Sequence, residues 1–197
     1  MNAYLEPSQP VTYEEKIKRS VFIANVEICH NEEESKSFLN RITSEHHNAT
    51  HNCRAYIIGE TEYSSDDGEP SGTAGRPILN AIKRSGLVNV MVIVTRYYGG
   101  VKLGVRGLID AYGGVAEKAL SMAGSAERVI TCEVAVSLEY GSMGIISKLL
   151  DAYNPSWQYG EAVNVTANIP VDDKERISRE LEELKARKII TYWEKKS

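Results

Sequence analysis

One continuous stretch, residues 90–120, constrains the fold more than any other part of the chain. It opens with five consecutive apolar residues, 90–94, a pattern typical of a buried strand. From Val105 to Leu120, apolar residues recur at the spacing of one helix face. The linking segment, Thr95–Gly104, holds two tyrosines, two cations and three glycines. We therefore predict a strand, a glycine-rich loop and a helix start, where free backbone N–H groups and the helix dipole favour an anion.

The charge around this stretch is uneven. The whole chain has a formal net charge of −4, which argues against indiscriminate binding of nucleic acid. Residues 71–109 nevertheless contain no acid, and they carry six cations: Arg76, Lys83, Arg84, Arg96, Lys102 and Arg106. This segment is either a solvated basic face or part of a surface that binds an anion.

An acidic cluster, formed by Asp66, Asp67 and Glu69, comes directly before the basic segment. It lies within residues 60–75, which are rich in turn-forming residues and predict a long loop. The three acids are able to hold Mg²⁺ or to act as an acid–base pair. Because no second carboxylate cluster is apparent, we favour a structural role in turns, capping or pairing with Arg76 or Arg96.

Other candidates for chemistry carry less weight. His51 and Cys53 lie two residues apart on a predicted strand, 51–59, and therefore share a face. A His–Cys couple is able to act as a nucleophile or bind a metal, but without a third partner we favour core packing. The chain shows no zinc, phosphate-loop or dinucleotide motif. We predict no catalytic residue, no metal ligand and no cofactor.

The remaining pattern predicts two domains, 1–126 and 127–197, divided by the small residues 121–126. Strands and helices alternate in the first domain, which indicates an α/β-layer arrangement. The second reads as strand, helix, two strands, helix and strand, at 128–138, 143–153, 157–160, 161–169, 172–188 and 189–193. That order is the β-α-β-β-α-β plan of a ferredoxin-like domain. The predicted fold class is therefore α+β.

Two segments of the chain, Ser65–Pro77 and Thr95–Gly104, resemble the long signatures of the YigZ/IMPACT family. Lys18–Ala24 and His51–Tyr56 resemble shorter ones, and the predicted tail is similar to the bacterial two-domain form. The resemblance implies an N-terminal domain similar to domain IV of elongation factor G and a ferredoxin-like domain similar to its domain V. Arg106 and Asp110 depart from the family pattern, which often has a small and a basic residue at these places.

The resemblance also bears on function. It implies no established enzymatic activity. Eukaryotic members regulate translation by binding a protein partner that activates a stress kinase, and nucleic-acid or ribosome binding has been proposed for bacterial ones. We therefore predict a non-catalytic cytoplasmic protein that binds RNA or the ribosome and translation machinery. The alternatives are a protein-partner module without nucleic-acid binding and an enzyme acting on a phosphorylated small molecule.

The predicted ligand-binding residues, for an anion, RNA or a partner, come from the two long signatures and the helix that follows the second. They are Asp66, Asp67, Glu69, Ser71, Thr73, Arg76, Arg96, Tyr97, Tyr98, Gly99, Gly100, Lys102 and Arg106. No apolar run approaches the ~20 residues of a membrane helix, and the first residues lack the apolar region of a signal peptide. We expect no membrane contact, and we favour a monomer.

Overall fold

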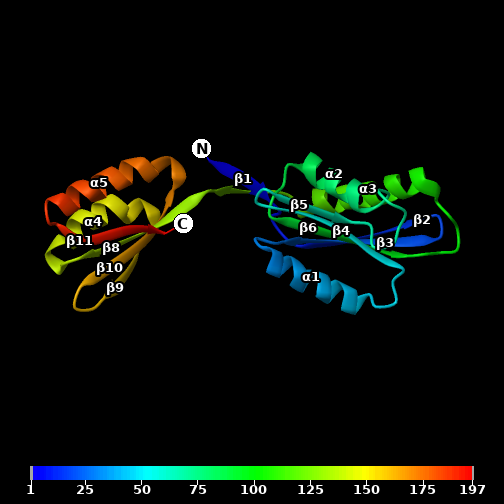
Figure 1. The fold of residues 1–197 in the computed structure, drawn as a ribbon, viewed down its shortest axis with the longest axis horizontal. Coiled ribbons are helices and arrows are strands. Elements are labelled where there is room, and N and C mark those ends of the chain that lie inside the picture. Colours follow the sequence, from blue (N-terminus) through cyan, green and yellow to red (C-terminus); the bar gives the residue numbers. More distant parts are fainter. Residues whose placement is uncertain (1, 197) are drawn as a thin grey trace. The chain divides into compact units, whose positions relative to one another are not determined.

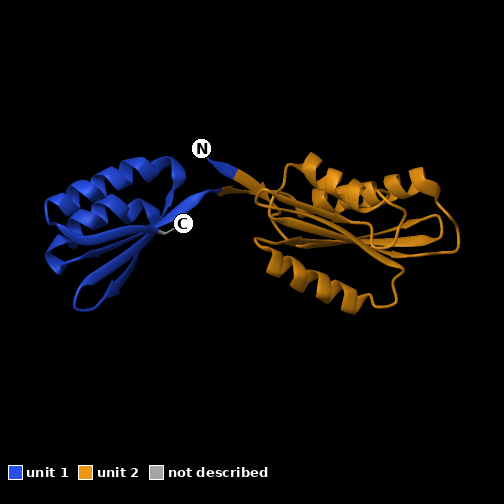
Figure 2. Ribbon diagram, viewed as in Figure 1, with its two compact units in different colours: residues 1–3, 129–197 blue, residues 4–128 orange. Residues whose placement is uncertain are grey.

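The computed structural model describes residues 2–196 and divides them into two compact units (Figures 1 and 2). The N-terminal unit is Tyr4–Arg128. The C-terminal unit comprises the residues up to Ala3 together with those from Val129 onward. Strand β1 (Ala3–Glu6) pairs with β7 (Ala126–Val129) in a two-stranded sheet. The boundary between the units therefore falls within both of these strands.

A five-stranded antiparallel sheet forms the centre of the N-terminal unit. Its strands are β2 (Val11–Ile17), β3 (Ser20–Ile28), β4 (His51–Ile58), β5 (Thr61–Ser65) and β6 (Val90–Tyr97). Their order in the sheet is β2-β3-β6-β4-β5, so β6 is the middle strand. This position explains why the apolar run at 90–94 has no polar alternation: both faces of β6 are covered.

Helices cover both faces of this sheet (Figure 1). α2 (Gly75–Ser85) and α3 (Gly104–Ala123) lie on one face, and α1 (Glu32–Glu45) lies on the other. Side chains of β6 alternate between the two resulting cores, as the period of a strand requires. Val90, Val92 and Val94 pack in the core with α2 and α3. Met91 and Ile93 pack in the core with α1.

The ends of these helices follow from local sequence. Asn31 caps α1 by accepting a hydrogen bond from the Glu34 N–H at 2.8 Å, which is the usual role of Asn at this position. Gly86 ends α2 in the left-handed conformation, with φ of 71°, where a residue without Cβ is favoured. Helix α3 begins at Gly104, directly after the glycine-rich loop.

Three sequence predictions were wrong at element ends. Residues 60–75 are not all loop, because β5 is a polar edge strand paired with β4. The strand predicted over 128–138 is interrupted at Ile130 and splits into β7 and β8 (Thr131–Leu138). Residues 121–126, predicted to divide the two domains, are not all linker, because α3 extends to Ala123 and β7 begins at Ala126.

The C-terminal unit has the predicted ferredoxin-like fold. Its elements are β8, α4 (Met143–Leu150), β9 (Ser156–Tyr159), β10 (Val163–Pro170), α5 (Lys174–Ala186) and β11 (Ile190–Lys196). The antiparallel sheet has the order β11-β8-β10-β9. Both helices pack on one face of it, over a core that includes Val136, Ile146 and Leu181. The α+β fold class is thereby confirmed.

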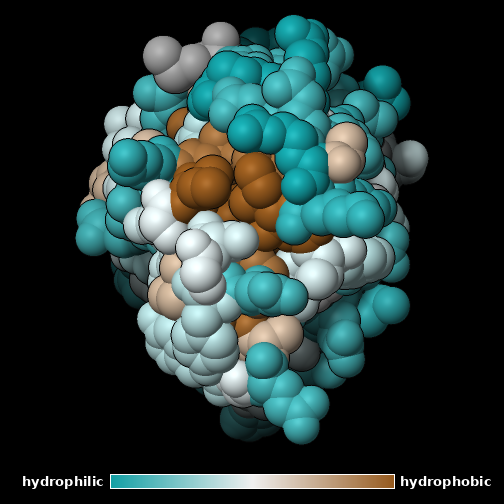
Figure 3. Space-filling view, turned by 90° about the vertical axis from the view of Figure 1, so that its left-hand side faces the viewer, coloured by the Kyte–Doolittle hydropathy of each residue, from teal (hydrophilic) through white to brown (hydrophobic). Residues whose placement is uncertain are grey.

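A groove of about 650 Å³ lies between α4 and α5 of the C-terminal unit. Its lining includes the apolar side chains of Ile145, Leu149 and Leu184, and a space-filling view shows a brown hollow among polar residues (Figure 3). Its lining residues are Gly141, Gly144, Ile145, Lys148, Leu149, Arg176, Glu180, Glu183, Leu184 and Arg187. Within residues 2–196, no helix is long and apolar enough to cross a membrane.

Candidate functional site

The two segments that contain the acidic cluster and the glycine-rich loop meet at a cleft of about 480 Å³ in the N-terminal unit. One wall comes from the start of β4 and the turn-rich loop, and the other from the end of β6 and the start of α3. The lining residues are Thr50, His51, Glu69, Pro70, Arg96, Tyr98, Lys102, Leu103, Gly104, Val105 and Leu108. We call this feature the cleft.

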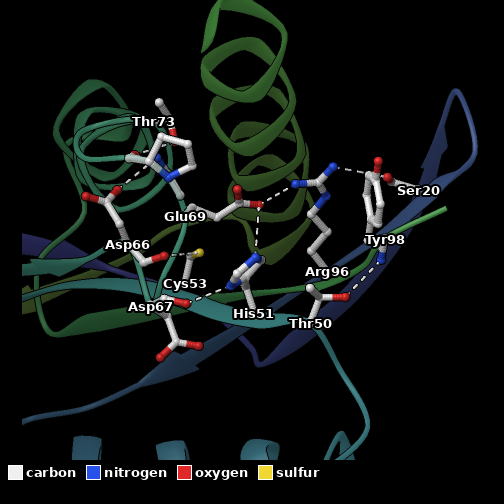
Figure 4. Close-up of polar contacts among 12 residues, drawn as sticks. Ser20, Thr50, His51, Cys53, Asp66, Asp67, Glu69, Thr73, Arg96 and Tyr98 are labelled. Carbon is white, nitrogen blue, oxygen red and sulfur yellow. Dashed lines mark hydrogen bonds and ion pairs between the residues drawn. The ribbon is translucent and has the colours of Figure 1, made fainter. Parts of the chain in front are cut away.

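A buried ion pair joins the two walls (Figure 4). Arg96 Nη1 donates to Glu69 Oε1 at 2.5 Å, and the hydroxyl of Tyr112 donates to the same oxygen at 2.8 Å. Glu69 is 8% exposed and Arg96 is 5% exposed. Burial raises the pKa of Tyr112, so its hydroxyl stays a donor. Arg96, predicted as a ligand-binding cation, lines the cleft but is buried, and it pairs with Glu69 of the acidic cluster, one of the two pairings expected from the sequence.

Arg96 also fixes the aromatic side of the cleft. Its guanidinium lies 5.4 Å from the ring centroid of Phe22 and 5.2 Å from that of Tyr98. These are cation–π distances, and they hold the ring of Tyr98 in place. The Tyr98 N–H donates to Thr50 Oγ1 at 3.1 Å. Tyr98 remains 44% exposed, so the cleft presents an ordered aromatic ring to solvent.

His51 lines the cleft, and the prediction that it packs in the core was wrong. Its Nδ1 lies 2.7 Å from the carbonyl oxygen of Asp67 (Figure 4). A carbonyl oxygen only accepts hydrogen bonds, so Nδ1 carries the proton. Nε2 faces Glu69 Oε1 at 3.9 Å, which is beyond hydrogen-bond distance.

Cys53 does pack in the core, as predicted. It is fully buried, and its Sγ donates to the carbonyl oxygen of Asp66 at 2.9 Å. Burial raises the pKa of the Cys53 thiol to about 12, so it is protonated near neutral pH and a poor nucleophile. Within residues 2–196, no group of three or more His, Cys, Asp and Glu side chains is placed to hold a metal ion.

The other two acids of the cluster shape the loop. The carboxylate of Asp66 accepts hydrogen bonds from the N–H groups of Gly72, Ala74 and Gly75, at 2.8, 3.0 and 2.8 Å. Burial raises the pKa of Asp66, but these three donors lower it by more, so the net shift is downward. Asp67 accepts from the N–H of Asn52 at 2.7 Å. Neither acid is among the residues that line the cleft.

The hydroxyls of the acidic loop differ from each other. Thr73 is buried, and its hydroxyl donates to the carbonyl oxygen of Pro70 at 2.6 Å. Ser71 is exposed. Both were predicted as ligand-binding residues, and both lie outside the cleft lining.

The cation at the cleft mouth is Lys102. It is exposed, and it forms no ion pair with any residue in the range 2–196. The N-terminus of α3 begins beside it at Gly104, and its N-cap residue Leu103 makes no side-chain cap hydrogen bond. The first N–H groups of a 20-residue helix are therefore free to bind an anion next to a lysine.

Two further predicted cations lie elsewhere. Arg76 lines a neighbouring groove between α2 and α3. Arg106 is on the first turn of α3 with its side chain 87% exposed, and it pairs with Asp110 at 3.2 Å. The structure does not bring either residue into the cleft lining.

The rest of the glycine-rich loop has a structural role. The hydroxyl of Tyr97 bonds to His46 Nδ1 at 2.9 Å, away from the cleft. Gly99 packs so closely on the turn between β2 and β3 that a Cβ there would lie 1.8 Å from the carbonyl oxygen of Arg19. Gly100 adopts φ of 80°, which favours glycine. These residues set the path of the loop and thereby the position of Tyr98.

Several lining residues were not predicted from sequence: Thr50, His51, Pro70, Leu103, Gly104, Val105 and Leu108. For His51 a signal was present, because it begins one of the shorter segments of family resemblance. The apolar residues at the start of α3 gave no such signal. The spacing of Val105 predicts a position on the apolar helix face, and it does not tell whether that position is buried in the core or exposed in the cleft.

Comparison with known proteins gives consistent matches. The Impact N-terminal domain matches residues 18–120, a range that contains every residue of the cleft. An IMPACT family member from Haemophilus influenzae is 34% identical, with 96% of each chain covered. The IMPACT family member YigZ from Escherichia coli is 38% identical, with 76% of each chain covered. A solved structure described as that of a hypothetical protein is 32% identical, with a TM-score of 0.74 and 96% of each chain covered.

Proposed function

This chain belongs to the IMPACT family, and on that basis we propose that it binds single-stranded RNA of the translation machinery in the cleft, without catalysing a reaction. The observation that carries the proposal is the combination of an exposed, ordered Tyr98, a Lys102 without an ion pair in residues 2–196, and the N-terminus of α3 without a side-chain cap, all around one cavity. Together they offer the two things that a nucleotide needs: an aromatic face for the base and positive charge for the phosphate.

The phosphate would lie at the start of α3. Backbone N–H groups without intrahelical partners, the positive end of the helix dipole and the ammonium of Lys102 all favour an anion there. The apolar side chains of Leu103 and Val105 at the same end would cover the sugar.

The base would stack on Tyr98. Stacking on aromatic side chains contributes about 1–3 kcal/mol per base and tolerates any base, because every base has a π face. Single-stranded RNA suits this arrangement better than a duplex, in which the bases are already stacked and the deep major groove is closed to side chains.

The charge distribution supports a small contact rather than an extended basic surface. Of the six cations in residues 71–109, four are paired with acids: Lys83 with Glu62, Arg84 with Glu117, Arg96 with Glu69 and Arg106 with Asp110. Lys102 and Arg76 remain without an ion pair among residues 2–196. We therefore expect a shallow salt dependence, with a log–log slope of about −0.7 for each phosphate contacted.

The chemistry of the buried groups favours binding over catalysis. The carboxylate of Glu69 is engaged by Arg96 and by the Tyr112 hydroxyl, which gives it a structural role in joining the two walls of the cleft. Cys53 is held as a neutral thiol, as its raised pKa implies. The groups most able to react are thus either engaged in the ion pair or protonated.

The proposal is tested by fluorescence anisotropy with a labelled single-stranded RNA of about ten nucleotides. Tyr98→Ala should weaken binding by about tenfold or more, through the loss of stacking. Lys102→Ala should weaken binding of every RNA sequence similarly and reduce the salt slope by about 0.7. Lys16→Ala is the matched control: Lys16 is exposed and without a partner among residues 2–196, and it lies on β2, outside the cleft.

Co-sedimentation with ribosomes, before and after nuclease treatment, extends the test to the translation machinery. Binding of the wild-type protein should be lost with Tyr98→Ala and kept with Lys16→Ala. A wild-type protein that binds neither RNA nor ribosomes at low salt would refute the proposal. A captured protein partner that survives nuclease treatment would instead support the protein-partner module.

A further inference from the structure

We infer that His51 Nε2 accepts a hydrogen bond from the 2′-hydroxyl of a bound ribose, so that the cleft distinguishes RNA from DNA. This inference rests on the proposed function and specifies its ligand. The 2′-hydroxyl is the group that allows a protein to tell RNA from DNA at one position.

The tautomer of His51 is the first step. The hydrogen bond from Nδ1 to the Asp67 carbonyl oxygen, at 2.7 Å, places the imidazole proton on Nδ1. In the neutral ring Nε2 is then an acceptor. It belongs to a side chain that is 20% exposed and lines the cleft, and it points toward Glu69, which lines the cleft as well (Figure 4).

The surroundings of Glu69 are the second step. Its Oε1 accepts hydrogen bonds from Arg96 Nη1 and from the Tyr112 hydroxyl. The carboxylate oxygen nearest to His51 Nε2 is therefore already engaged by two donors of the protein.

The spacing of the two acceptors is the third step. His51 Nε2 and Glu69 Oε1 lie 3.9 Å apart, and neither has a proton to share with the other. An oxygen placed between them can reach hydrogen-bond distance of both, and a hydroxyl is the ligand group that brings both such an oxygen and a donor proton. The ring nitrogen is the better acceptor of the two, because Oε1 already receives two hydrogen bonds.

The position of His51 agrees with a ribose at this point. Its neighbour Thr50 bonds to the backbone N–H of Tyr98, so the acceptor lies beside the proposed stacking ring. On the opposite wall are Lys102 and the start of α3, the proposed phosphate site. A sugar links base and phosphate in every nucleotide, and its 2′-hydroxyl would face the wall that carries His51. A deoxyribose would leave the half-buried Nε2 without a donor, which disfavours DNA.

The test compares three single strands of one sequence by fluorescence anisotropy: RNA, 2′-O-methyl RNA and DNA. The 2′-O-methyl strand keeps the RNA sugar shape but has no hydroxyl to donate. The wild-type protein should bind RNA about five- to tenfold more tightly than either of the others, the range expected for one hydrogen bond.

His51→Phe keeps a planar ring without an acceptor, and it should bind all three strands with the affinity that the wild type has for DNA. His47→Phe, at an exposed histidine outside the cleft, is the matched control and should keep the preference.

The outcomes separate the inference from the proposed function. Equal wild-type affinity for the three strands overturns the inference and leaves RNA binding in place. Binding of none of them refutes both. Nitrogen-15 NMR of the wild-type imidazoles gives a second readout that needs no variant. A proton on Nδ1 alone at neutral pH supports the inference, and a proton on Nε2 overturns it.

Discussion

At the scale of single residues, Glu69 and Arg96 connect the turn-rich loop, the central strand and, through Tyr112, helix α3. Removing one member of a buried ion pair leaves an uncompensated charge and costs roughly 3–5 kcal/mol. Arg96→Ala would therefore report on folding as much as on binding. Lys102, which is exposed and unpaired within residues 2–196, is the cleaner site for a binding variant.

A pH prediction follows from Asp66. Its three backbone donors lower its pKa in the folded protein below the ordinary value of 3.8. A carboxyl whose pKa is lowered by folding contributes stability above its unfolded pKa, and the contribution is lost as pH falls through the folded value. Asp66→Asn should therefore reduce the free energy of unfolding at pH 7, by about 1 kcal/mol, because hydrogen bonds to a charged acceptor are replaced by weaker ones to a neutral amide. The difference from wild type should shrink between about pH 4 and pH 2.

Urea unfolding from pH 7 down to pH 2.5 measures this difference. Asp110→Asn is the control for loss of one carboxylate, since Asp110 is exposed and pairs with Arg106 at the surface. A destabilisation by Asp66→Asn that stays constant across the pH range would show that the ionised carboxylate is not what the loop requires.

The limits of sequence reasoning are clearest for His51 and Arg96. His51 was predicted on a strand and lies on one, whereas Arg96 was predicted in the glycine-rich loop and lies near the end of β6. The sequence named Arg96 as one possible partner of the acidic cluster, but it could not show that His51 stands at the sheet end beside the cleft or that the partner of Arg96 is Glu69. These two positions depend on the pairing of β4 with β6 and on the path of the turn-rich loop across the ends of those strands. The family resemblance grouped the two loops, and the contacts between them come from the tertiary fold.

At the scale of elements, α3 contains two adjacent glycines in its interior. Gly113 and Gly114 lie inside this helix, where each glycine costs about 1 kcal/mol relative to alanine. A Cβ at Gly113 would meet Pro77 at an ordinary 3.7 Å, and one at Gly114 would meet no atom within 4 Å. Close helix packing therefore does not require either glycine.

We predict that Gly114→Ala stabilises the protein by about 0.5–1 kcal/mol, because it lowers the backbone entropy of the unfolded chain without a clash. Gly99→Ala is the matched contrast and should be strongly destabilising, since its Cβ would overlap the Arg19 carbonyl. Urea unfolding measures the stability change of each variant, which follows from the shift in midpoint when the m-value is unchanged. If Gly114→Ala destabilises the protein instead, the helix has no room for a Cβ at this position.

Element types were predictable where periodicity was strong and failed where it was weak. The buried run of β6 and the amphipathic α3 have clear patterns, and the structure contains both. β5 has exposed polar residues at most of its positions, and only its pairing with β4 makes it a strand. Ile130 interrupts a run of strand-forming residues, and no local signal marks that interruption.

At the scale of the whole molecule, the two units have separate cores. The N-terminal cores contain residues from β2 to α3, and the C-terminal core contains residues from β8 to β11. No residue of these clusters is shared between the units. All residues of the cleft, from Thr50 to Leu108, belong to the N-terminal unit. Stability and the proposed binding should therefore respond separately to changes in the two cores.

Leu181→Ala tests this separation in the full chain. Leu181 is fully buried in the C-terminal core, and its truncation should lower the stability of that unit by about 2–5 kcal/mol. Hydrogen exchange should show reduced protection in β8 and α5, with unchanged protection in β6. RNA affinity should equal that of the wild type. Leu120→Ala, in the core of the N-terminal unit, is the matched variant. It should reduce protection in β6 and leave protection in β8 and α5 unchanged. Equal loss of protection in β6 and β8 with Leu181→Ala would show that the two units unfold as one.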